Sequence, residues 1–160
     1  MTQELVARFR EAFAADLAAA PVLTLRQADA IDSYGTASSR DEALDAVTDS
    51  YLAQHAAGIF HLDPASWRHY LPALVDFTQR HLGTPTLVVG TLIASLRPPD
   101  RASPRIGSLT EAQEALVREL MEILAYSPES TWQKEACQAL EEWWIENPRY
   151  RTKAGRSGTA

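Results

Sequence analysis

Cysteine and glycine are scarce in this sequence: there is one cysteine, Cys137, and there are seven glycines in 160 residues. A single cysteine excludes an internal disulfide and fits a reducing compartment, so we expect a cytoplasmic protein. Few glycines favour helices, because glycine destabilises a helix interior by roughly 1 kcal/mol. Hydrophobic residues make up 46% and charged residues 22% of the chain, which is typical of a globular domain with its own core.

Long apolar runs are also missing. The longest candidate, residues 87–96, contains Gly90, Thr91 and Ser95 and has about half the ~20 residues that a membrane-spanning helix needs. The first residues, Met1–Glu4, carry neither the basic region nor the apolar region of a signal peptide. We therefore expect no membrane partner.

Sequence signatures of catalysis and metal binding are absent as well. The chain has no glycine-rich phosphate loop and no G-x-S-x-G nucleophile motif. Its four histidines include no pair at the i, i+4 spacing that holds zinc on one helix, and Cys137 has no partner cysteine. We predict no catalytic residue, no metal site and no cofactor.

Charge is unevenly distributed along the chain. The net charge is −6, yet residues 149–160 carry four basic residues and no acidic one, which leaves 11 basic against 21 acidic residues in 1–148, or −10. An acidic body repels phosphates and makes nucleic acid an unfavourable partner, whereas it suits a basic protein.

We expect one helical domain over residues 1–148, followed by a basic, flexible tail over 149–160.

Apolar residues recur at helical spacing along most of the chain, which predicts an all-α fold: a single compact, bundle-like domain of about seven helices. Local signals mark most of the predicted starts. Capping-box spacing marks three of these starts, and a capping residue followed by proline marks three others. The predicted helices cover residues 3–19, 24–34, 39–55, 64–82, 84–96, 110–124 and 127–147.

Two consequences of this assignment can be checked directly. The apolar stripes place Leu17, Ile31, Leu44 and Val47 in the core. Residues 86–96 are rich in β-branched side chains, so a strand is the rival there; length and the Thr-Pro start favour a helix.

Pro72 lies inside the helical pattern of residues 64–82. Proline lacks the amide that would bond the carbonyl of Arg68 and its ring crowds that carbonyl, so we expect a kink or break at Leu71-Pro72. Arg68 is then placed to bond the freed carbonyls or to pair with a nearby acid. The alternative is a ligand-binding or partner-binding notch that uses Arg68, His69 and Tyr70.

Residues 62–73 read LDPASWRHYLPA. The pieces Leu62-Asp63-Pro64, Trp67-Arg68-His69-Tyr70 and Leu71-Pro72-Ala73 resemble the core motif of an uncharacterised bacterial family, a domain of unknown function. The resemblance extends to residues 9–13, 109–113 and 139–144. Trp67 stands where such proteins usually have phenylalanine, and an alanine-rich helix replaces their acidic, aromatic stretch. The resemblance implies a helical fold and carries no established activity.

Two aromatic pairs, Trp67/Tyr70 and Trp143/Trp144, are candidate interface residues because they exceed what a small core needs. Our leading hypothesis is a non-catalytic protein-interaction domain, in one version an immunity or antitoxin-like protein that blocks a basic toxin. The alternative is a small enzyme or ligand-binding protein with its site at the Pro72 break. A third hypothesis is a homo-oligomer formed through the tryptophan-bearing last helix.

Overall fold

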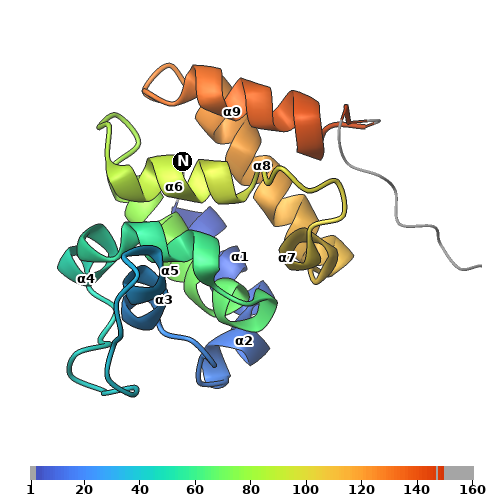
Figure 1. Cartoon of the computed structure of the whole chain (residues 1–160). Helices are drawn as coiled ribbons and strands as arrows, with labels where there is room; N and C mark the ends of the chain where they lie inside the picture. The colour runs from blue at the N-terminus through green and yellow to red at the C-terminus, as the bar shows by residue number, and fades with distance from the viewer. Residues whose placement is uncertain (1–2, 147, 150–160) are drawn as a thin grey trace, which may run out of the picture.

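A computed structural model describes residues 3–146, 148 and 149. Its regular elements in these residues are all helices, which confirms the all-α prediction (Figure 1). Nine are α-helical stretches, η1 is a 3₁₀ helix and η2 is a π-helix. In chain order they are α1 (Gln3–Ala12), α2 (Ala14–Ala18), α3 (Leu25–Asp32), α4 (Asp49–Gln54), η1 (Ala56–His61), α5 (Pro64–Arg80), α6 (Leu87–Ser95), α7 (Pro104–Gly107), α8 (Glu111–Tyr126), α9 (Gln133–Ala139) and η2 (Leu140–Trp144).

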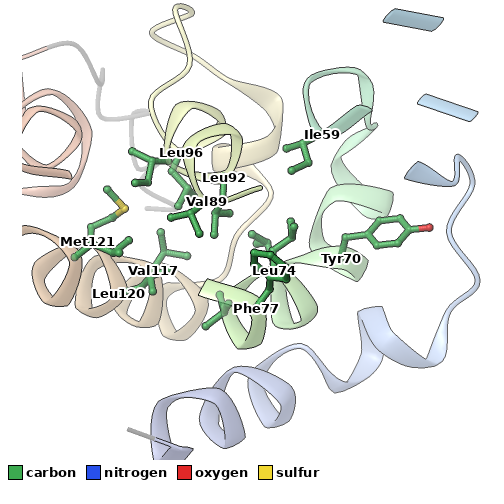
Figure 2. Close-up of a cluster of buried hydrophobic side chains, with 14 of the residues drawn as sticks. Ile59, Tyr70, Leu74, Phe77, Val89, Leu92, Leu96, Val117, Leu120 and Met121 are labelled. Carbon is green, nitrogen blue, oxygen red and sulfur yellow. The ribbon is translucent and has the colours of Figure 1, made fainter. Parts of the chain in front are cut away.

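The core lies where α5, α6 and α8 bring their apolar faces together (Figure 2). Leu74 and Phe77 of α5 face α6, and Val117 and Leu120 of α8 approach α6 from another side. Helix α6 is therefore apolar over a broad face and is buried in the middle of the molecule. This confirms that residues 87–95 form a helix rather than a strand.

Several predicted helix starts are confirmed at the level of single hydrogen bonds. Thr24 caps α3 and Thr110 caps α8, and in both helices the glutamine three residues later returns a bond to the cap amide. Asp63 accepts hydrogen bonds from the amides of Ala65 and Ser66, with Pro64 at the first helical position of α5.

The helix predicted over residues 39–55 is wrong except for its last part, α4. The Asp41 side chain closes a local turn by accepting bonds from the amides of Ala43 and Leu44. Asp45 is drawn instead to Arg26 and to the Tyr51 hydroxyl, which holds the chain out of a helical path. Helix α4 begins only where Thr48 caps the amide of Tyr51.

Four side chains expected in the core are exposed to solvent. Leu44 and Val47 are 57% and 43% exposed because their segment is not helical, and Leu17 and Ile31 are 38% and 50% exposed. Leu17 is turned outward because the first predicted helix is interrupted at Phe13, whose ring packs into the core against Phe9 at a centroid distance of 5.6 Å.

Two predicted starts, at Thr84-Pro85 and at Ser127-Pro128, are displaced along the chain. The helix expected from Thr84-Pro85 is capped at Thr86. After Ser127-Pro128 the chain makes turns, in which the Thr131 amide bonds the carbonyl of Leu82, so α9 begins only at Gln133. Between the helices predicted over 84–96 and 110–124, where no helix was predicted, lies the short helix α7.

Helix α5 continues through Pro72 without the predicted break. Leu71 and Leu74 on either side are completely buried, and Pro72 is itself buried. Their packing outweighs the ~3 kcal/mol that proline costs inside a helix. The Arg68 carbonyl still lacks its usual i+4 amide donor, because residue 72 has none.

Candidate functional site

Trp67 and Tyr70, predicted as interface residues, are buried in the core. The Trp67 indole donates to the Ser95 hydroxyl at 3.3 Å, which links α5 to α6. The Tyr70 hydroxyl accepts a bond from the Leu25 amide at 3.2 Å, at the first turn of α3. Burial raises the pKa of Tyr70. Both side chains hold helices together and offer no surface to a partner in this structure.

Arg68 and His69 converge on Asp16 of α2. The Arg68 Nε donates to Asp16 Oδ1 at 2.8 Å, and His69 Nδ1 lies 2.9 Å from the Asp16 carbonyl oxygen. The second Asp16 oxygen accepts from Gln113 of α8 at 3.2 Å. Arg68 thus pairs with an acid, one of the two structural roles that the sequence suggested, and joins α2 to α5.

Trp143 and Trp144 are both buried, at 1% exposure each. The Trp144 indole donates to the Leu96 carbonyl at 2.8 Å, whereas the buried Nε1 of Trp143 has no acceptor among the described residues. The π-helix η2 carries both rings, and the amide of Ile145 bonds the Leu140 carbonyl five residues back. An exposed tryptophan anchor, for a partner or for a second copy, is therefore not present at η2.

A groove does lie beside Pro72, on a different face of α5 from Tyr70. It has a volume of about 250 Å³ and opens between α1, α2, α4 and α5. We call it the Pro72 groove. Its apolar lining is Leu17, Val47, Leu52, Pro72 and Ala73, and its polar lining is Arg10, Thr48, Asp49, Asp76 and Arg80.

The charged side chains of the groove form a chain of ion pairs. Arg80 binds both carboxylate oxygens of Asp49, one of them at 2.8 Å, and its Nη2 also reaches Asp76 Oδ2 at 3.2 Å. Arg10 lies 3.8 Å from the other oxygen of Asp76. Hydrogen bonding to Arg80 lowers the pKa of Asp49, and the same contact raises the pKa of Arg80.

One side of the groove is lined by Val47, Thr48 and Asp49. They end the segment 41–49, which reads DEALDAVTD and which we call the acidic lip. Arg26 fixes the lip by donating from Nε and Nη2 to the two oxygens of Asp45, at 3.0 and 2.9 Å. Burial alone would raise the pKa of Asp45, but hydrogen bonds from Arg26 and from the Asp41 amide outweigh it and hold the pKa at about 2. The lip is thus clamped by an ionised Asp45.

Comparison with protein families gives one match. The model of a family described as a family of unknown function, DUF6714, matches residues 1–148. The chain belongs to DUF6714. No curated protein and no solved structure is similar enough to give a match. The matched range equals the helical domain that the sequence predicted. The bacterial origin and the motif around Pro72 stay predictions for this DUF6714 chain.

A second, open cleft of about 420 Å³ lies beside Pro98 and Pro99 of the DUF6714 chain and is lined also by Arg97, Arg101 and Glu142. Arg97 donates to both oxygens of the buried Glu142, one of them at 2.8 Å. This contact lowers the pKa of Glu142. The carboxylate is therefore occupied by an internal partner, and the cleft lacks the aliphatic lining of the Pro72 groove.

Two negative findings apply to the part of the DUF6714 chain that the structure describes. No three His, Cys, Asp or Glu side chains there are grouped so that they could hold a metal ion. No helix there combines the length and the apolar character that crossing a bilayer requires.

Sequence reasoning pointed to Pro72 but named Arg68, His69 and Tyr70, which do not line the groove. Leu17 and Val47 were assigned to the core, and Arg10, Asp76 and Arg80 were not singled out. The available signal was that residues 41–49 carry four acidic residues and no basic one, which is unfavourable for a helix end packed in a core.

Proposed function

We propose that this DUF6714 chain is a non-catalytic protein-interaction domain that binds a basic partner protein at the Pro72 groove. The observation that carries the proposal is the groove itself, a hollow with an apolar lining bordered by charged side chains. Leu17 and Val47 of that lining are exposed, and Leu52 and Pro72 are buried. In protein interfaces the anchor side chains sit in well-packed pockets that the surrounding contacts close off from water, and this hollow offers a place for one anchor of the partner.

The size of the groove favours a protein side chain over a small molecule. Its volume of about 250 Å³ lies below the roughly 300–1,000 Å³ that is usual for small-molecule sites. Pro72 and Ala73 come from one helix, whereas Leu17 and Val47 come from two other segments, so the walls are preformed by the fold. A preformed hollow binds at a lower entropic cost than a surface that must order on binding.

Charge favours a basic partner. Residues 1–148 carry an excess of ten acidic residues, and Asp49 at the end of the acidic lip lines the groove. Complementary charge raises association rates and disfavours acidic competitors. An immunity or antitoxin-like role against a basic toxin is the specific form of this proposal. A gene neighbourhood without a recurrent toxin or other partner would count against that form.

The enzyme or small-ligand alternative receives less support from the geometry. Arg68 and His69 are engaged with Asp16, and the Tyr70 hydroxyl is engaged with Leu25. The three side chains line neither of the two clefts described above.

Photo-crosslinking in the native host tests the proposal. A photoreactive residue replaces Val47 at the groove in the full chain, and in a control chain it replaces Ala115, which is exposed on α8. We expect a basic protein to crosslink from position 47 only, and Ala73→Arg, which fills the groove, to abolish that product. Identical products from both positions, or products insensitive to Ala73→Arg, would refute the proposal.

A further inference from the structure

We propose that the partner segment places one large apolar side chain in the Pro72 groove and, beside it, a lysine or arginine that replaces Arg10 on Asp76. This inference rests on the proposed function and adds the chemistry of the partner. It follows from an asymmetry in the ion pairs of the groove.

The two oxygens of Asp76 have unequal partners. Oδ2 accepts a hydrogen bond from Arg80 at 3.2 Å, with the two residues one helical turn apart on α5. Among the residues that the structure describes, Oδ1 faces only the distant Nη2 of Arg10 at 3.8 Å, beyond hydrogen-bond length. The Oδ1 position is therefore weakly satisfied.

Arg10 is the cation that a partner can displace most easily. Its side chain is 62% exposed, and exposed pairs of this kind contribute little to stability. Arg80 is held more firmly, because it binds Asp49 through both guanidinium nitrogens as well as Asp76. Loss of the Arg10 contact leaves Asp76 as an acceptor beside Ala73 and Pro72, at the edge of the apolar lining.

The surroundings favour a cation over an anion at this position. Asp41 and Glu42 of the acidic lip are exposed, and the lip has no basic residue. An anionic segment that paired with Arg10 would meet a domain with ten more acidic than basic residues in 1–148 and be repelled. A partner that covers the groove also removes water from Asp76, which strengthens a hydrogen-bonded charge pair there.

The test uses random 12-residue peptides displayed on phage and selected against the full chain. Only those selected peptides are analysed that fail to bind the Ala73→Arg chain. They must still bind the Ala115→Arg chain, which has the same change in charge outside the groove. We expect these peptides to share a large apolar residue with a lysine or arginine within four positions of it.

A synthetic peptide from this selection, and its version with glutamine in place of that cation, then complete a double-mutant cycle. Asp76→Asn is expected to weaken the affinity for the cationic peptide about two- to fivefold and to leave the affinity for the glutamine peptide unchanged. Arg10→Ala is expected to raise the affinity for the cationic peptide by a similar factor. Melting curves check that each variant folds.

The outcomes separate the two proposals. The selected peptides could depend on the groove and yet share no cation, or Asp76→Asn and Arg10→Ala could leave their affinities unchanged. Either result would overturn the exchange on Asp76 and leave the groove as a docking site. Failure to select any peptide that depends on Ala73 would overturn both.

Discussion

Two arginine ion pairs fix the position of α2 and of the acidic lip. Arg68 joins α5 to Asp16, and Arg26 joins α3 to Asp45. Both ion pairs are mostly shielded from water, with side-chain exposures between 5% and 20%. At such positions the removal of one partner strands the other, which costs more than the pair contributes on an exposed surface.

Arg68→Ala is expected to lower the free energy of unfolding by about 2 kcal/mol, because a shielded hydrogen bond to a charged group contributes about 1.5–3 kcal/mol. Urea denaturation at pH 7 measures the change. Arg8→Ala is the matched control, since Arg8 pairs with Glu119 on the exposed surface and should cost less than about 0.5 kcal/mol. Equal costs for the two variants would show that Arg68 does not pin α2.

Asp45 should make the stability of the fold depend on pH in the acidic range. Its pKa is depressed from 3.8 to about 2 in the folded chain, so its contribution is present above pH ~4 and is lost as the pH falls towards 2. That shift corresponds to about 2 kcal/mol. Asp45→Asn should therefore destabilise the chain by about this amount at pH 7 and flatten the loss of stability between pH 4 and 2. Glu122→Gln, an exposed site on α8, should leave the pH profile unchanged.

At the scale of whole elements, close backbone packing joins α3 to η1. A Cβ atom on Gly58 would lie 2.5 Å from the Leu25 carbonyl oxygen and 2.7 Å from the Asp29 amide nitrogen. Both neighbours are backbone atoms of α3, so the two helices must separate to accept any larger residue. Glycine is required at position 58 because the two backbones lie so close together; its φ angle is not positive and does not itself require glycine.

Gly58→Ala is expected to destabilise the chain by about 2–3 kcal/mol, within the range for overpacked cores. Gly107→Ala in α7 is the control, because a Cβ there meets nothing within 4 Å. Thermal unfolding of the two variants gives the comparison. A Gly58→Ala chain as stable as the control would contradict the packing of η1 on α3.

Pro72→Ala should stabilise the chain by about 1 kcal/mol. The helix already passes through this residue, so alanine restores the hydrogen bond to the Arg68 carbonyl and removes the ~3 kcal/mol that proline costs inside a helix. The loss of two buried CH₂ groups offsets about 1.6 kcal/mol of this gain. Chemical denaturation monitored by circular dichroism measures the difference. A loss of more than about 1 kcal/mol would mean that the packing around α5 requires the proline ring.

The elements that sequence predicted well are those set by neighbouring residues. The caps at Thr24, Asp63 and Thr110 depend on side chains within three positions, and all three are observed. The failures have distant causes: Asp45 bonds Arg26, and Thr131 bonds Leu82, 49 residues away. The spacing of apolar residues along the chain does not depend on such distant contacts. Helices over 39–48 and 128–132 were therefore predicted where turns occur.

For the molecule as a whole, the four aromatic candidates and the Pro72 groove are separate. Trp67, Tyr70, Trp143 and Trp144 fill the core, although their number suggested an interface. The exposed hollow is built instead from aliphatic side chains that a helical wheel assigns to the interior, Leu17 and Val47. The candidate site was therefore predictable only in its position near Pro72, because its lining depends on where α2 and the acidic lip are held.

The central claim is that this DUF6714 chain binds proteins through the Pro72 groove. Methyl NMR of the full chain, titrated with the selected peptide, tests it most directly. The largest shift changes should occur in the methyl groups of Leu17, Val47 and Leu52, with little change at the exposed Leu87 and Ile145, which lie outside the groove. Changes concentrated at Leu87 or Ile145, with the groove methyl groups unmoved, would contradict it.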